Sequence, residues 1–165
     1  MTFIVHSCLA RFADKSHRTL IRREAKAECI YSFLGIAYLN LGRLNEAMEM
    51  HEQQLAISKK FGHKVAEGLA YGNLGSVYTA KQNFTHAIKA FHSSLAIAKS
   101  TNDKIAEATT SGNIGNILFK LGLRSEAEKY WLMHRSMSRE IGDVDGEQRA
   151  ALNLAQLGKK RKSIG

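Results

Sequence analysis

The sequence predicts an all-α fold, a solenoid of antiparallel helical hairpins, and three observations support this prediction. Residues recur at a step of 40: Gly35, Gly75, Gly115; Asn73, Asn113, Asn153; Ala47, Ala87, Ala127. The chain contains no proline, and 24% of its 165 residues are charged. Such a composition favours helices. A repeat of this length is typical of units that bury their apolar faces only against their neighbours.

Each 40-residue unit is expected to contain two helices. In the second unit, residues 65–80 carry apolar side chains at helical spacing, and a second apolar stripe begins at Phe84. Short segments separate the predicted helices and contain Gly, Asn or Asp, which suit helix ends and helix caps. These segments are 41–43, 81–83 and 121–122 within units, and 61–63, 101–103 and 141–143 between units. We therefore expect three hairpins in a row.

The expected organisation has three parts. Residues 1–22 form an N-terminal capping helix or the remnant of a preceding repeat. One face of that helix would carry Ile4, Val5, Cys8, Leu9 and Phe12. Residues 23–158 form the array, with units at about 25–64, 65–104 and 105–144 and a half unit at 145–158. The half unit would cap the C-terminal end, and residues 159–165 form a basic tail.

Composition and motifs argue against several classes of protein. Cys8 and Cys29 cannot form a disulfide framework and match no zinc pattern. No 18 apolar residues run together, and the N-terminus does not resemble a signal peptide. The seven histidines are scattered, without a metalloprotease motif, phosphate loop or nucleophile elbow. We predict a cytoplasmic protein that is not an enzyme and needs no cofactor or metal.

Two other locations stay open. The basic run 159–162 could serve as a nuclear-import signal, although a solvated tail explains it as well. Early arginines, such as Arg11 and Arg18, leave a mitochondrial presequence as an alternative, but Asp14 and Glu24 interrupt that basic pattern.

The recurring glycines and alanines have a steric interpretation. Where the two helices of a hairpin cross closely, Gly75 is expected to face Ala87, so that the backbones approach. The order of residues resembles the tetratricopeptide repeat. The second unit matches this repeat at Tyr71, Leu74, Gly75, Tyr78, Ala87 and Phe91. The first unit departs from the pattern at His51, and the third departs at Ser111 and Leu118.

The 40-residue spacing, with the segments 51–58 and 67–75, is similar to the Leu-Gly-Asn repeat adaptors of spindle orientation, known as LGN or Pins. The resemblance implies a right-handed superhelix. Its first helices would line a concave groove that receives a peptide or helix from a partner. Chaperone-binding members carry a basic residue where this chain has Ser32, Gly72 or Gly112, so a chaperone C-terminus is a poor candidate ligand.

In that fold, Asn73, Asn113 and Asn153 lie on the face of the first helices that borders the groove. An asparagine amide offers both a donor and an acceptor, as a peptide backbone requires. Phe33 occupies the position in the first unit. The alternative is that the asparagines bond to neighbouring helix termini and orient the repeats.

Further residues are expected in the same groove. Asn116, Lys120 and Arg149 should project into its C-terminal half and make it electropositive. Gly72 and Gly112 should leave room for a ligand because they lack side chains.

The net charge of +9 bears on the partner. Outside the tail, the remaining excess favours a protein partner with an acidic or extended segment. One alternative is a binder of nucleic acid or another anionic surface, which would need exposed aromatic residues between basic ones. The aromatic residues here, such as Phe91 and Trp131, fall at repeat core positions. The other alternative is a scaffold fragment that self-associates through the array ends.

Overall fold

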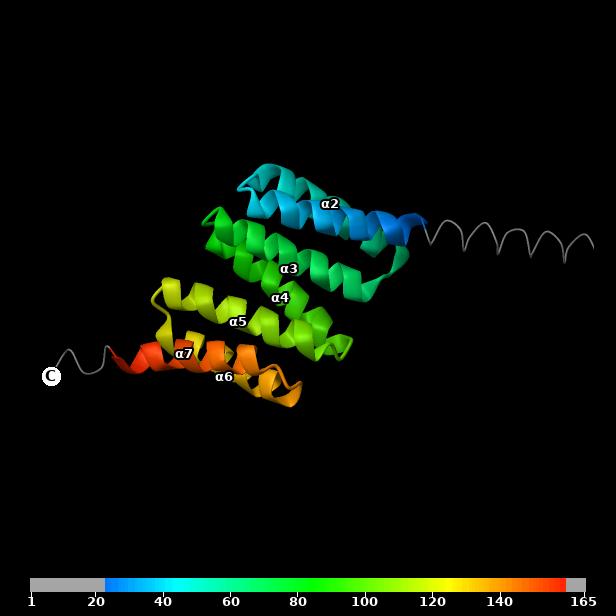
Figure 1. Ribbon diagram of the computed structural model, residues 1–165. Coiled ribbons are helices and arrows are strands. Elements are labelled where there is room, and N and C mark those ends of the chain that lie inside the picture. The colour runs from blue at the N-terminus through cyan, green and yellow to red at the C-terminus, as the bar shows by residue number, and fades with distance from the viewer. Residues whose placement is uncertain (1–22, 160–165) are drawn as a thin grey trace, which may run out of the picture.

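The computed structural model describes residues 23–159, which form seven α-helices and no strand. A helix over residues 23–40 comes first. It is followed by α2 (Leu44–Phe61), α3 (Lys64–Ala80), α4 (Phe84–Ser100), α5 (Lys104–Lys120), α6 (Arg124–Glu140) and α7 (Val144–Lys159). Consecutive helices run antiparallel and stack along one direction (Figure 1). The prediction of an all-α solenoid of hairpins is confirmed. The expected capping segment 1–22 and the tail after Lys159 lie outside the described residues.

The helices form two layers. The first helices of the hairpins, which are 23–40, α3 and α5, lie with α7 in the front layer of Figure 1, and the second helices lie behind them. Helices adjacent in the chain make most of the contacts within the described part. This pattern is expected when each repeat packs on its neighbours alone.

Each turn between helices contains one residue in the left-handed region of φ, which satisfies the last carbonyl groups of the preceding helix. These residues are Gly42, Gly62, Gln82, Asn102, Gly122 and Gly142. At the second hairpin, the amide of Asn83 donates to the carbonyl of Tyr78 at 2.9 Å. The carboxylates of Asp103 and Asp143 accept from helix amides at 3.0 and 2.9 Å. The expected turns and caps are therefore confirmed.

The close crossing in each hairpin differs from the expected glycine–alanine pair. A Cβ atom on Gly75 would lie 2.7 Å from the ring of Phe91, and one on Gly115 would lie 2.6 Å from the indole of Trp131. In the first hairpin, the ring opposite the glycine is the imidazole of His51. The glycine partner is thus a flat ring, one helical turn beyond the recurring alanine, because a ring needs the space of the missing side chain.

The largest apolar cluster joins the second and third hairpins. Its members are Ala87, Phe91, Leu95, Ile114, Ile117, Leu118, Ala127 and Trp131. Leu154 and Leu157 of α7 pack against it. The last helix therefore covers the third hairpin.

Candidate functional site

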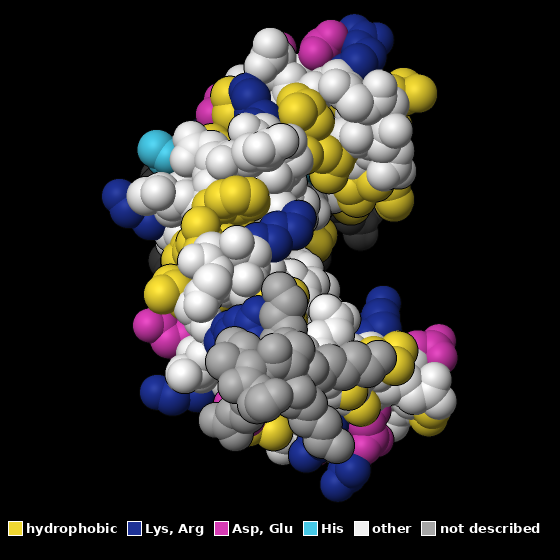
Figure 2. All heavy atoms as spheres, turned by 90° about the vertical axis from the view of Figure 1, so that its left-hand side faces the viewer, with side chains coloured by type: hydrophobic (Ala, Val, Ile, Leu, Met, Phe, Trp, Pro, Cys, Tyr) yellow, Lys and Arg dark blue, Asp and Glu magenta, His cyan; other side chains and the backbone are white. Residues whose placement is uncertain are grey.

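The first helices border a groove that consists of two adjoining cavities. One cavity, of about 380 Å³, lies between α3 and α5 with α4 beneath it. The other, of about 460 Å³, lies among α3, α5 and α7. Both are lined by Ser76, Phe91 and Asn113, so they form one continuous groove. Figure 2 shows the molecule hollowed between its two ends on this side.

The cavity between α3 and α5 is rimmed by apolar side chains. Val65, Leu69 and Ile105 are 59%, 53% and 68% exposed, and Ile97 of α4 lines the same cavity. We call these four residues the apolar half of the groove. Asp103 also lines this cavity, but its carboxylate caps the first turn of α5. The apolar half therefore offers hydrophobic surface without a free charge among its described lining residues.

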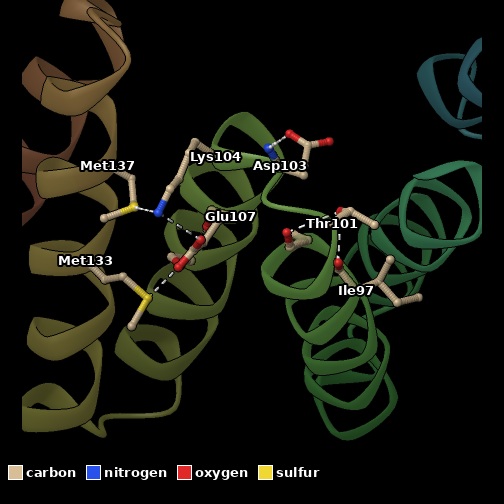
Figure 3. Close-up of polar contacts among 10 residues, drawn as sticks. Ile97, Thr101, Asp103, Lys104, Glu107, Met133 and Met137 are labelled. Atoms are coloured by element: carbon tan, nitrogen blue, oxygen red, sulfur yellow. Dashed lines mark hydrogen bonds and ion pairs between the residues drawn. The ribbon is translucent and has the colours of Figure 1, made fainter. Parts of the chain in front are cut away.

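The first turn of α5 is held in place by several polar contacts (Figure 3). The carboxylate of Asp103 accepts from the amide of Ala106. The ammonium of Lys104 lies 3.9 Å from both the carboxylate of Glu107 and the sulfur of Met137 on α6. These contacts join α5 to its own N-terminal turn and to α6, and so they fix the rim of the apolar half before any ligand binds.

The second cavity has four amide side chains and one lysine in its lining. We call its polar residues the amide half of the groove: Asn113, Asn116, Lys120, Asn153 and Gln156. The carbonyl oxygen of Asn116 accepts from the indole NH of Trp131 at 3.0 Å and from the amide of Asn153 at 3.1 Å. Two amides of this half therefore connect α5 to α6 and α7. Lys120 is exposed and forms no ion pair with any described residue.

The three recurring asparagines have different surroundings. Asn153 bonds to Asn116, as expected if it orients neighbouring helices. Asn73 lines the cavity between α3 and α5, and its buried NH₂ group has no hydrogen-bond partner in the described part of the chain. Asn113 lines both cavities. A half turn about the last side-chain bond would exchange the amide nitrogen and oxygen of Asn73, so either group can be directed to the groove.

The two predicted glycines and Arg149 are placed differently from one another. Gly72 lines the groove as expected. Gly112 is buried instead, and a Cβ atom there would lie 2.8 Å from the imidazole of His134, so this glycine makes room for a ring of α6. Arg149 lines neither cavity, and its guanidinium lies 4.0 Å from the carboxylate of Asp143. The structure therefore does not bring Gly112 and Arg149 to the groove.

Sequence reasoning missed the apolar half. It placed residues 65–80 on one helix with apolar side chains at helical spacing, but it did not indicate that Leu69 is exposed beside the groove. A usable signal was present, because Val65 and Leu69 precede Asn73 at steps of four residues, as Ile105 precedes Asn113 at a step of eight. Residues at this spacing share one face of a helix.

The excess positive charge is located mainly at the chain ends. Residues 1–22 and 160–165 together contain one acidic residue, Asp14, and seven basic residues. The basic ones are Arg11, Lys15, Arg18, Arg22, Lys160, Arg161 and Lys162. The described array is therefore close to neutral, and the charge preference of the groove depends on its own side chains.

The described residues contain neither a cluster of metal ligands nor a helix suited to span a membrane. Within residues 23–159, no three His, Cys, Asp or Glu side chains gather as ligands for a metal ion. No helix in this range is both long and apolar enough to cross a membrane.

Part of the chain matches the model of a known protein family. Residues 26–100, which cover the first two hairpins, match the family model described as "Tetratricopeptide repeat". A search of curated proteins found no match. Neither result concerns the LGN or Pins adaptors, so that subclass stays a prediction.

Two solved structures share the fold. The crystal structure of the TPR domain of Arabidopsis FLU has a TM-score of 0.67 at 17% identity, covering 71% of this chain and 98% of that one. The crystal structure of BtubC (BKLC) from P. vanneervenii has a TM-score of 0.54 at 17% identity, covering 83% of this chain and 64% of that one. The first two hairpins are therefore similar to the tetratricopeptide repeat family, and the described array shares the fold of a solved tetratricopeptide repeat domain.

Proposed function

We propose that this protein is a non-catalytic adaptor that binds a peptide or helical segment of a partner protein in the groove bordered by α3, α5 and α7. Tetratricopeptide repeat domains are generally protein-interaction modules. The observation that supports the groove as the site is the exposed apolar rim of Val65, Leu69 and Ile105, which lies directly beside unpaired amide groups. A concave, mainly apolar surface with a few polar groups is typical of a binding site.

Charge distribution favours a protein partner over nucleic acid for the described array. A binder of single strands combines a basic track with exposed aromatic side chains. In this groove the aromatic side chains Phe91 and Trp131 are buried, and the lining contains a single lysine, Lys120, among the described residues. A cytoplasmic or nuclear location and self-association through the array ends stay predictions.

A peptide-display selection tests the proposal. A library of random peptides of about twelve residues is selected on the parent protein, and the enriched peptides are then titrated against the variant Leu69→Glu with Ile105→Glu. Binding should fall at least about tenfold, because two carboxylates would replace the apolar rim. Leu132→Glu is the matched control, since Leu132 is an exposed leucine of α6 that lines neither cavity. Circular dichroism checks that each variant is folded.

The titrations of the two variants can contradict the proposal. If the enriched peptides bind the folded double variant as tightly as the parent, the groove is not their site. If Leu132→Glu alone weakens binding, the partner surface lies on the second helices instead.

A further inference from the structure

We infer that the segment bound in this groove is an extended chain with apolar side chains at one end and an acidic group about six residues away. The apolar side chains occupy the apolar half, and the acidic group pairs with Lys120 in the amide half. This inference rests on the proposed function and adds the chemistry of the partner.

The width of the groove favours an extended chain over a helix. The Cα atoms of α3 and α5 approach within 8 Å of each other, so the floor between them is narrow. A helix with its side chains is about 10–12 Å across. Where α3 and α5 are closest, a helix cannot enter between them, whereas an extended backbone can place alternate side chains there.

The amides near the middle of the groove favour the same conformation. Asn73 has a buried NH₂ group without a partner, and Asn113 makes no side-chain hydrogen bond to any described residue. The backbone of a helix satisfies its own hydrogen bonds, but an extended backbone presents unpaired N–H and C=O groups. The two asparagines supply donors and acceptors that match such a backbone.

The apolar half sets the chemistry of one end. Val65, Leu69 and Ile105 are all more than half exposed, although they belong to rigid helices. A leucine-sized side chain that removes this surface from water contributes about 1.5–3 kcal/mol when fully buried. Two such side chains at alternate positions of the segment would provide most of its affinity, because alternate side chains of an extended chain point the same way.

Lys120 sets the chemistry of the other end. Among the described residues it is the one charged side chain that lines the second cavity, and its neighbours there are neutral amides. The C-terminal dipole of α5 disfavours an anion, but it is equivalent to only about half a charge. The full charge of the lysine therefore prevails. An exposed pair of this kind contributes about 0.2–1 kcal/mol, so it orients the segment more than it tightens binding.

The separation between the apolar and acidic groups of the segment follows from the length of α5 between the two halves of the groove. Leu69 corresponds to Thr109 one repeat later, and both line the first cavity. From Thr109 to Lys120 the groove follows about eleven residues of α5, or roughly 17 Å at 1.5 Å per residue. Measured from Ile105, the span is roughly 22 Å. An extended chain covers this distance with about five to seven residues.

Labelled peptides test the inference directly by fluorescence anisotropy. The first probe has about ten residues, with two leucines at alternate positions near one end and an aspartate about six residues away. A second probe replaces the aspartate with lysine, and a third replaces both leucines with serine. We expect the parent to bind the first probe about threefold to tenfold more tightly than the second, and to bind the third at least tenfold more weakly.

Variants of the protein test the same pairing from the side of the groove. Lys120→Glu should invert the preference, so that the lysine probe binds more tightly than the aspartate probe. Lys129→Glu is the matched control, because Lys129 is an exposed lysine of α6 that lines neither cavity, and it should leave the preference unchanged. The double variant Leu69→Ser with Ile105→Ser should weaken both leucine probes.

The outcomes separate this inference from the proposed function. Equal binding of the aspartate and lysine probes would overturn the pairing with Lys120. A helical spectrum of the bound probe would overturn the extended conformation. If display-selected peptides bind in the groove but the leucine–aspartate probe does not, the inferred chemistry is wrong while the groove function stands. If selected peptides ignore the groove variants, the proposed function itself fails.

Discussion

The first and third hairpins share a backbone plan but differ at the ring that closes them. In the third hairpin, Trp131 is 1% exposed against Gly115, and its indole NH donates to Asn116. In the first, the imidazole of His51 is fully buried, its Nε2 has no partner among the described residues, and its Nδ1 lies 3.3 Å from Gln54. The same gap therefore accepts different rings, but of these two rings only that of Trp131 has all of its polar atoms paired.

The two hairpins also differ in what covers their first helices. Ile114 of α5 is fully buried beneath α4, whereas Leu34, at the same repeat position, is 42% exposed. Likewise Ile30 is 57% exposed, whereas Thr110, at the same position of the third hairpin, is 4% exposed. The neighbouring helix, and not the residue type, decides burial at these positions. The third hairpin should consequently be the more stable of the two.

The largest expected effect is the loss of the third hairpin's ring. Trp131→Ala should lower the free energy of unfolding by about 3–5 kcal/mol, because it leaves a cavity in the largest apolar cluster. His51→Ala should cost less, since it also removes an unpaired buried nitrogen. Urea denaturation followed by circular dichroism measures both. Equal losses of unfolding free energy in the two variants would mean that Trp131 and His51 stabilise their hairpins equally, and the proposed difference between the hairpins would be wrong.

A smaller loss is expected when the acceptor of the indole is removed. Asn116→Ala should cost about 1–3 kcal/mol, because it leaves the NH of Trp131 unpaired and breaks the bond to Asn153. Asn45→Ala is the matched control in the first hairpin, where the amide oxygen of Asn45 accepts from Lys81 on the exposed surface. The control should change stability by less than about 0.5 kcal/mol. The same denaturation assay decides, and a neutral Asn116→Ala would show that α7 docks without the amide link.

A ring without an unpaired polar atom in the first hairpin should raise the free energy of unfolding, in contrast to the two losses above. His51→Phe combined with Gln54→Leu restores the residue type found at Phe91 and removes both the unpaired nitrogen and the buried amide that would lose its partner, so we expect a gain of about 1 kcal/mol. His92→Phe, on the exposed surface of α4, serves as control and should stay within about 0.5 kcal/mol of the parent. A destabilised double variant would show that the larger ring does not fit against Gly35.

The smallest effect near neutral pH concerns the two buried histidines. Burial lowers the pKa of His51, although its hydrogen bond to Gln54 raises it slightly. Burial also lowers the pKa of His134, Arg149 lowers it further, and Asp143 raises it. Because each folded pKa lies below the unfolded value of about 6.5, the unfolded state binds more protons at lower pH. Stability should therefore fall as the pH drops from about 7 to 5, by at most about 1.4 kcal/mol per pH unit for each proton.

Melting temperatures measured across this pH range check the prediction. His51→Phe should show a shallower decline than the parent, because only His134 then resists protonation. An identical decline would mean that His51 accepts a proton in the folded state as easily as in the unfolded state.

Much of the fold could be predicted because it depends on local chemistry. The 40-residue step, the left-handed turn residues such as Gly62 and Asn102, and the caps by Asp103 and Asp143 follow from short-range preferences. The C-terminal half unit carries a further local signal. Ala155 stands where the other units have glycine, as expected for a helix that no ring-bearing partner follows within the described residues.

The candidate site was predicted only in part. Gly72, Asn73, Asn113, Asn116, Lys120 and Asn153 line the two cavities, and their part in binding a partner stays a prediction. The roles of Gly112 and Leu69 were not evident, since a helical pattern shows which residues share a face but not which element covers that face. The register between α5 and α6 decides that Gly112 meets His134.

The sequence by itself determined the number, length and order of the helices in the described array, because periodicity, caps and turn residues act within a few residues of one another. Tertiary structure decided which ring lies against each glycine, which asparagines are bonded and which stay unpaired, and that Leu69 borders a groove. Those outcomes depend on how neighbouring helices cross, and side chains far apart in the chain meet only once the helices have packed.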